Sequence, residues 1–327
     1  MTSSSGPVVT VLTDPIPTTM QYYRERLKAR IRPLLRKLDG KAPLKKPKYG
    51  GHYAVTRSLI EGLRKAGIPF RYNPQKVSEC TEKVVVLAGV ATLEQAIALR
   101  KKGVIKKLAA GPNVYTLPSE FPALAGSGSI DRSIANSPWV KQLYVIDTPK
   151  LEPTLVIWPA GVDEEYWKPK GSPKNPRSML FYSKRPERQM LQECHRIAEA
   201  AGFNVTILKY GTYTVEQYKT LLDENSVLVH FVEQESQGIS LLESWAMDTP
   251  SIVWNPGIFF WQGHNVISSS APYLTEETGV FFRDAPDFGR VIEKFASHGF
   301  AFSPREWVLR HQTDELSARH LMELMEF

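Results

Sequence analysis

Two carboxylates that lie eight residues apart are the clearest chemical feature of the sequence. Glu235 lies in a polar stretch that ends at Gly238, and Glu243 lies in the apolar pattern that follows. Ionised carboxylates accept strong hydrogen bonds from hydroxyl groups, whereas they repel a phosphate. We therefore expect the pair to contact a polyhydroxylated ligand. The alternative is an ordinary surface Glu together with a first-turn Glu that stabilises a helix dipole.

The residues around these carboxylates predict a strand, a loop and a helix. Residues 226–232 form a β-branched apolar run that is typical of a buried strand. A helical pattern begins at Ile239 and ends at Thr249-Pro250. The first N–H groups of a helix lack partners and lie at the positive end of its dipole, so the loop predicts an anion site. A nucleotide-sugar has both kinds of group, because its phosphates lie between two hydroxyl-bearing rings.

This segment resembles the Glu-x7-Glu element of retaining GT-B glycosyltransferases of family 4, also called group 1. The family pattern is E-S-F-G-x-x-x-L-E-A-M-A, and this chain has Glu235-Ser236-Gln237-Gly238 and then Leu242-Glu243-Ser244-Trp245-Ala246. Gln237 replaces the aromatic residue of the pattern. Trp158-Pro159-Ala160-Gly161-Val162-Asp163 is a second match, because it resembles the P-x-G-V-D that enters the second domain of these enzymes.

The resemblance implies an α/β fold of the GT-B type, with two Rossmann-like domains whose parallel sheets face each other across a cleft. Strand and helix patterns that alternate along the chain also favour parallel sheets. We expect an acceptor domain at 1–158 with an insertion at 15–49, and a nucleotide-sugar donor domain at 159–303. A C-terminal helical segment at 304–327 is expected to return to the first domain.

The same resemblance implies roles for particular residues. Glu235 would hold the sugar and Glu243 the ribose, while Lys184 and Arg185 would stabilise the diphosphate as the glycosidic bond breaks. His52 is a candidate acceptor contact. The remaining predicted donor-binding residues are Gly50, Gly51, Arg188, Tyr210, Tyr213, Ser236, Gln237, Gly238, Ile239 and Ser240. A plain turn at the two glycines and a solvated charged turn at 183–188 are the alternative interpretations.

The implied activity is retaining transfer of a sugar from a nucleotide-diphosphate-sugar to a glycan, lipid or small-molecule acceptor. No cofactor or metal is expected, because the sequence lacks an Asp-x-Asp motif and a Cys/His cluster with zinc spacing. Two alternatives stay open. One is a GT-B sugar-nucleotide epimerase, and the other is a non-catalytic protein of this fold that binds a glycan or an anion.

Composition limits the setting in which the protein works. Cys80 and Cys194 are too few for a disulfide framework and suit a reducing compartment. The N-terminus lacks the pattern of a signal peptide, and no apolar run approaches the roughly 20 residues that span a bilayer. We therefore expect a cytoplasmic protein.

The net charge of +7 is concentrated in residues 21–48. This segment has eleven Lys or Arg and two acidic residues, so it carries +9 and the rest of the chain carries −2. One interpretation is a helix packed on the first domain with a solvated basic face. The other is an arm that contacts an anionic membrane or acceptor peripherally. Nucleic acid is not expected, because few aromatic residues lie among the basic ones.

Overall fold

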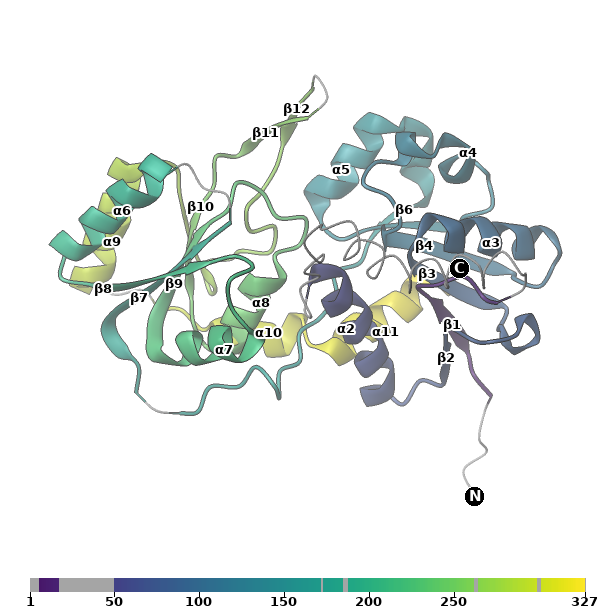
Figure 1. Ribbon diagram of the computed structural model, residues 1–327, viewed down its shortest axis with the longest axis horizontal. Helices are drawn as coiled ribbons and strands as arrows, with labels where there is room; N and C mark the ends of the chain where they lie inside the picture. The colour runs from purple at the N-terminus through teal and green to yellow at the C-terminus, as the bar shows by residue number, and fades with distance from the viewer. Residues whose placement is uncertain are drawn as a thin grey trace, which may run out of the picture. The chain divides into compact units, whose positions relative to one another are not determined.

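Two parallel sheets dominate the computed structural model, which describes residues 6–17, 50–171, 173–184, 188–261, 264–298 and 301–326. The predicted α/β class with parallel sheets is confirmed (Figure 1). Contacts divide the chain into unit 1 (Met1–Ala135, Tyr144–Val156 and Leu321–Phe327) and unit 2 (Asn136–Leu143 and Ile157–His320). In the described ranges, no helix is both long and apolar enough to cross a bilayer.

Unit 1 contains the six-stranded sheet, in the order β2-β1-β3-β4-β5-β6. Its first four neighbouring pairs, from β2-β1 to β4-β5, are parallel. The strands are β1 (Val9–Leu12), β2 (Phe70–Tyr72), β3 (Lys83–Ala88), β4 (Lys107–Asn113), β5 (Arg132–Ala135) and β6 (Leu155–Ile157). The α-helices are α2 (Gly51–Lys65), α3 (Val90–Lys101), α4 (Pro122–Ala125) and part of α5 (Pro138–Asp147). β1, β3 and β4 bury apolar side chains, which form the core of this unit.

Unit 2 contains the five-stranded parallel sheet, in the order β13-β10-β9-β7-β8. Its strands are β7 (Asn175–Ser183), β8 (Asn204–Lys209), β9 (Asn225–Phe231), β10 (Ser251–Trp254) and β13 (Gly279–Phe282). The helices are α6 (Arg188–Ala200), α7 (Val215–Glu224), α8 (Ile239–Ala246), α9 (Ala285–His298), α10 (Pro304–His311) and most of α11 (Asp314–Leu324). A separate antiparallel hairpin consists of β11 (Ile258–Trp261) and β12 (His264–Ile267).

Helices cover both faces of this second sheet, since its central strands are apolar on both sides. Met179 and Phe181 of β7 face the cluster that includes α6 and α9. Leu180 and Tyr182 alternate with them and face the cluster of α7, α8 and α10. Figure 1 shows α6 and α9 together on one side of the sheet and α7 and α8 on the other. The opposed layers make β7 and β9 a rigid base for the loops at their ends.

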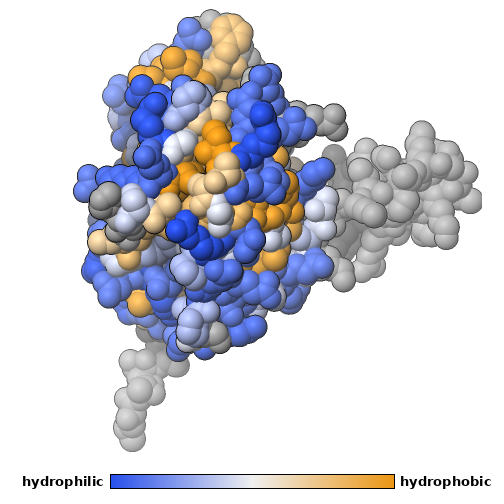
Figure 2. Space-filling model, turned by 90° about the vertical axis from the view of Figure 1, so that its left-hand side faces the viewer, coloured by the Kyte–Doolittle hydropathy of each residue, from blue (hydrophilic) through white to orange (hydrophobic). Residues whose placement is uncertain are grey.

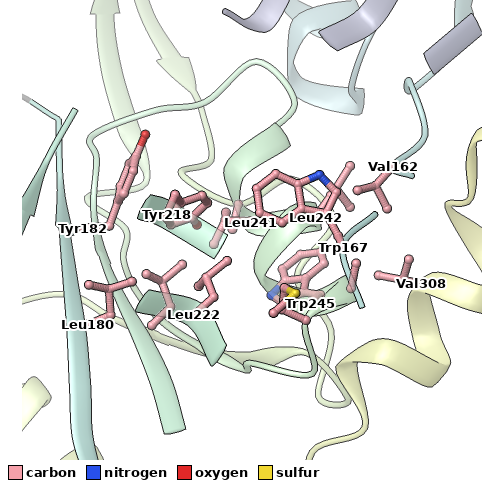
Figure 3. Close-up of a cluster of buried hydrophobic side chains, with 14 of the residues drawn as sticks. Val162, Trp167, Leu180, Tyr182, Tyr218, Leu222, Leu241, Leu242, Trp245 and Val308 are labelled. Atoms are coloured by element: carbon pink, nitrogen blue, oxygen red, sulfur yellow. The ribbon is translucent and has the colours of Figure 1, made fainter. Parts of the chain in front are cut away.

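α8 is anchored in the second of these clusters by large side chains. Leu241, Leu242 and Trp245 project from α8 and are almost fully buried (Figure 3). Trp167 packs in the same cluster, and Trp307 of α10 makes an edge contact with Trp245 at 5.4 Å between ring centroids. The N-terminus of α8 is therefore held in a fixed position relative to the sheet.

Several elements lie outside the sequence expectations. The hairpin β11–β12 and the helix α9 were not predicted, and the expected C-terminal helical stretch is interrupted between α10 and α11. The break follows from a backbone pairing, because Val162 N–H donates to Gln312 O and Asp314 N–H donates to Val162 O. Gly161 permits this approach, since a Cβ there would lie 2.3 Å from Thr313 O.

Candidate active site

Lys184 and Glu235 form an ion pair at one edge of the sheet of unit 2. The ammonium Nζ of Lys184 donates to Glu235 Oε1 at 2.8 Å. Lys184 follows β7 and Glu235 follows β9, and these two strands are parallel neighbours. Parallel strands end at the same edge of a sheet, so the topology alone brings the two loops together. An ammonium group has three N–H donors, and this bond uses one of them.

The backbone of Glu235 is fixed from two further directions. Its N–H donates to Ser269 O at 3.0 Å, and its carbonyl accepts the indole N–H of Trp139 at 2.9 Å. Asn136 Nδ2 donates to Ser236 Oγ at 3.2 Å, and Tyr273 donates through its hydroxyl to Asn136 O at 2.7 Å. These bonds set the position of the loop before any ligand binds.

Sequence reasoning did not find Trp139 and Asn136 as partners of the glutamate loop. They lie about 100 positions earlier in the chain, yet residues 136–143 belong to unit 2. Their local sequence pattern gives no signal for a contact with residues 235 and 236. Only the three-dimensional contacts reveal them.

Gly238 turns the chain from the loop into α8. It has φ 83° and ψ 54°, the left-handed conformation that costs little for glycine. Its carbonyl accepts the N–H groups of Leu241 and Leu242, at 3.0 Å and 3.2 Å. The first N–H groups of α8, those of Ile239 and Ser240, lie directly after this turn. The N-terminus of α8 therefore lies beside Glu235, and its role as an anion site stays a prediction.

Gln237 has a structural role that its place in the family pattern did not suggest. Its Nε2 donates to Ala160 O at 2.6 Å, and its Oε1 accepts Ala160 N–H at 3.1 Å. The side chain is only 4% exposed. The amide therefore pairs with the backbone of the 158–163 segment, which leaves the backbone of Gln237 as its possible contact with a donor.

Glu243 lies on the buried side of α8, one turn into the helix. Burial is the main cause that raises the pKa of Tyr213 and Tyr218, and the Glu243 carboxylate raises both further. Tyr218 donates to Ser240 O at 2.8 Å, which ties α7 to the first turn of α8. The carboxylate of Glu243 therefore lies within electrostatic range of both tyrosines.

The two tyrosines among the predicted donor-binding residues differ in exposure. Tyr210 is 48% exposed, and Lys184 Nζ lies 5.1 Å from the centroid of its ring. Tyr213 is packed against the α8 cluster, and its hydroxyl donates to the hydroxyl of Tyr182 at 3.1 Å. Of the two, Tyr210 has the ring that is free enough to stack on a ligand.

His230 is a buried ionisable group beneath the site. It is fully buried on β9 and stacks on Tyr182, with ring centroids 5.2 Å apart and an interplanar angle of 4°. Neither ring nitrogen has a hydrogen-bond partner among the described residues. Burial, and then the charge of Lys184, lowers the pKa of His230 to about 3. The ring is therefore neutral at physiological pH.

Other predicted residues lie in unit 1 or outside the described part of the chain. Gly50 and Gly51 form the N-terminus of α2, and His52 is exposed in its first turn. Arg185, the side chain of Arg188 and the basic segment 21–48 lie outside what the structure describes. In the described ranges, no three His, Cys, Asp or Glu side chains gather as a metal-binding group.

Comparisons with known proteins give matches among solved structures alone. No family model and no curated protein matches the sequence. A glycosyltransferase from Rickettsia africae ESF-5 matches with a TM-score of 0.58 at 13% identity, over 98% of each chain. The lipopolysaccharide outer core galactosyltransferase WaaB matches with a TM-score of 0.57 at 10% identity, over 97% of this chain and 98% of that one.

A third match is the catalytic domain of starch synthase IV from Arabidopsis thaliana, bound to ADP and acarbose. Its TM-score is 0.53 at 10% identity, over 98% of this chain and 99% of that one. The predicted similarity to GT-B glycosyltransferases is confirmed at the level of the fold by these matches. At such low identity, the activity has to be argued from the site.

Proposed function

We propose that this chain is a retaining glycosyltransferase that moves a sugar from a nucleotide-diphosphate-sugar to a hydroxyl-bearing acceptor. The observation that carries the proposal is the ion pair of Lys184 with Glu235 beside the N-terminus of α8. A cation, a carboxylate and free backbone donors within one loop cluster suit a ligand that has both phosphate and sugar parts.

Each group has a distinct task in this scheme. The diphosphate lies between Lys184 and the first N–H groups of α8, which stabilise the charge that grows as the bond from the sugar C1 to the phosphate oxygen breaks. Glu235 accepts hydrogen bonds from sugar hydroxyls, and Glu243 accepts them from the ribose. Tyr210 stacks on the base.

The transfer step balances without an added reagent. The acceptor oxygen forms a bond to C1 on the face that the leaving group vacates, and the leaving phosphate oxygen takes the acceptor proton. The configuration at C1 is retained. The positive charge that the scheme needs comes from the Lys184 ammonium and from the positive end of the α8 dipole, so we propose that transfer does not depend on a metal ion.

The acceptor is proposed to be a glycan or another hydroxyl-bearing molecule. The matched starch synthase domain is bound to ADP and acarbose, a nucleoside diphosphate and a sugar-like molecule. This supports the same two ligand classes here. The predicted acceptor contact of His52, the donor contact of Gly50 and Gly51, and the phosphate contacts of Arg185 and Arg188 remain predictions.

A thermal-shift screen of nucleotide-sugars tests the proposal. A donor present at about 100 times its dissociation constant adds about 2.7 kcal/mol of stability. The donor that stabilises the chain is then incubated with candidate acceptors, with and without a chelator. Transfer that persists with the chelator supports the scheme. Conversion of the donor without any acceptor indicates the epimerase alternative, and no stabilisation by any nucleotide indicates a non-catalytic protein.

A further inference from the structure

The hairpin β11–β12 exposes one apolar face. Ile258 lies opposite Ile267 in the register, and Phe260 lies opposite Asn265. Alternation along each strand therefore places these side chains on one face of the hairpin. Ile258, Phe260 and Ile267 are 64%, 68% and 69% exposed, whereas Val266 on the other face is 1% exposed. Figure 1 shows the hairpin extending from the sheet of unit 2, and Figure 2 shows hydrophobic surface at the top, where the hairpin lies.

The sequence around the hairpin is free of charge. No Asp, Glu, Lys or Arg occurs between Asp248 and Glu276, although 23% of the whole chain is charged. Surfaces that dock a protein partner normally surround their apolar centre with a polar rim that contains charges. A surface that enters a bilayer instead excludes charges, because each charged side chain resists transfer into the apolar phase. The lack of charge therefore favours lipid as the partner.

The size of the apolar face argues against a second copy of the chain as its partner. A stable protein interface buries about 800 Å² on each side. The three side chains are about two-thirds exposed, so together they expose roughly 400 Å² of apolar surface. A lipid interface needs no such minimum, since apolar side chains bind to it one by one in proportion to their area.

We propose that the hairpin inserts Ile258, Phe260 and Ile267 into the interfacial region of a lipid bilayer. The three side chains leave water for the boundary between headgroups and acyl chains, and Val266 keeps the hairpin attached to unit 2. Because the hairpin is uncharged, its insertion resists salt. The basic residues within 21–48, which carry the positive charge of the chain, add an attraction to anionic headgroups that salt screens.

The hairpin is joined directly to the glutamate loop. Ser269 O accepts the N–H of Glu235, and Ser270 Oγ donates to Glu233 O at 2.9 Å. Ile267 lies two residues before Ser269, so insertion brings the loop to within roughly 10 Å of the bilayer surface, at about 3.3 Å per residue. If the proposed function holds, the acceptor is then an amphiphile held in that membrane.

Vesicle flotation tests the insertion without requiring any activity. The full chain is mixed with neutral phosphatidylcholine vesicles, and with vesicles that also contain phosphatidylglycerol, at low salt and in 0.5–1 M NaCl, at which the screening length is only about 3–4 Å. The variant combines Ile258→Thr, Phe260→Thr and Ile267→Thr, because threonine keeps β propensity without the apolar bulk. Ile207→Thr is the matched control, since Ile207 is 42% exposed on the strand β8.

We expect the wild-type chain and the Ile207→Thr control to float with neutral vesicles at high salt. The triple variant should partition on the order of 1,000-fold more weakly, since each of the three large apolar side chains contributes about a factor of ten or more when buried. Unchanged circular dichroism and melting would show that the variant is folded. The single variant Phe260→Thr is expected to lose less vesicle binding than the triple variant does.

Three results would overturn the proposal. The triple variant could float as well as the wild type, or the wild type could fail to bind neutral vesicles at high salt. The third is a concentration-dependent dimer, seen by sedimentation and lost in the triple variant, which would make a second copy the partner of the hairpin. None of these results bears on nucleotide binding, so the proposed function is judged separately.

Discussion

The side-chain amide of Gln237 pairs in both directions with the backbone of Ala160. Nε2 donates to Ala160 O and Oε1 accepts Ala160 N–H, at 2.6 Å and 3.1 Å, in a buried position. This pairing joins the glutamate loop to the 158–163 segment. The two stretches of sequence that most resemble the GT-B family are therefore one structural unit, held together at the position where the chain departs from the family pattern.

The variant Gln237→Glu tests this pairing. It replaces the Nε2 donor with a carboxylate oxygen that faces Ala160 O, so a hydrogen bond is lost and a charge is buried. We expect the free energy of unfolding at pH 7 to fall by about 2–4 kcal/mol. Urea denaturation measures it, with Gln192→Glu on the exposed face of α6 as the control. Equal stability of the two variants would mean that the pairing contributes nothing.

Substitutions of Glu235 and Glu243 are expected to change different kinetic quantities. Glu235→Gln keeps the shape of the side chain but weakens the acceptor for sugar hydroxyls, so turnover should fall severely. Glu243→Gln should mainly weaken donor binding, since the ribose is remote from the bond that breaks. Steady-state kinetics with a direct binding measurement separates the two effects. An equal loss of turnover with unchanged donor affinity in both variants would contradict these roles.

Trp139 is expected to act on the site by positioning Glu235. Trp139→Phe removes the indole N–H that donates to Glu235 O and keeps most of the aromatic packing. The loss of one hydrogen bond of about 0.5–1.5 kcal/mol should reduce kcat roughly 3–10-fold with little change in KM. Trp254→Phe is a matched control, because Trp254 Nε1 donates to Arg283 O at 3.1 Å. A similar loss in both variants would point to general destabilisation.

His230 is expected to make stability depend on pH in acid. Its pKa is about 3 in the folded chain, because it is buried and lies near Lys184, and about 6.5 when unfolded. The unfolded chain therefore binds more protons between these values, so the contribution of His230 is complete above pH 6.5 and is lost as the pH falls towards 3.

The variant His230→Leu isolates this effect, since leucine is similar in volume and does not titrate. We expect the wild type to lose up to about 2 kcal/mol more than the variant between pH 7 and 5. At pH 7 the variant should be at least as stable, because neither imidazole nitrogen has a partner in the described structure. Chemical denaturation at several pH values measures both. Parallel pH profiles would show that His230 is not the titrating group.

Much of the fold was predictable because its signals are local. The apolar run of β9 and the glycine before α8 were predicted correctly from the apolar pattern and from turn chemistry. The hairpin β11–β12 was not, since its strands are only four residues long and alternate in exposure outside the main sheet. α9 is amphipathic, but no sequence motif marks its apolar positions.

The site was predictable only in part, for a related reason. Topology placed Lys184 near Glu235, because loops that follow neighbouring parallel strands must meet. The contacts of Trp139 with Glu235 and of Gln237 with Ala160 join segments that are 96 and 77 positions apart. Such pairings depend on side-chain geometry after folding, which a single sequence does not reveal.

Calorimetric titration of nucleoside diphosphates into the wild type and Lys184→Ala tests the central claim most directly. Lys168→Ala is the control, because Lys168 also forms an ion pair with a glutamate, Glu165, and both of these side chains are exposed. We expect the wild type and the control to bind one of UDP, ADP or GDP, and Lys184→Ala to bind it at least tenfold more weakly. With the matching donor, turnover of Lys184→Ala should fall roughly 10²–10³-fold. Equal affinity in all three chains, or no binding of any nucleoside diphosphate, would contradict the account.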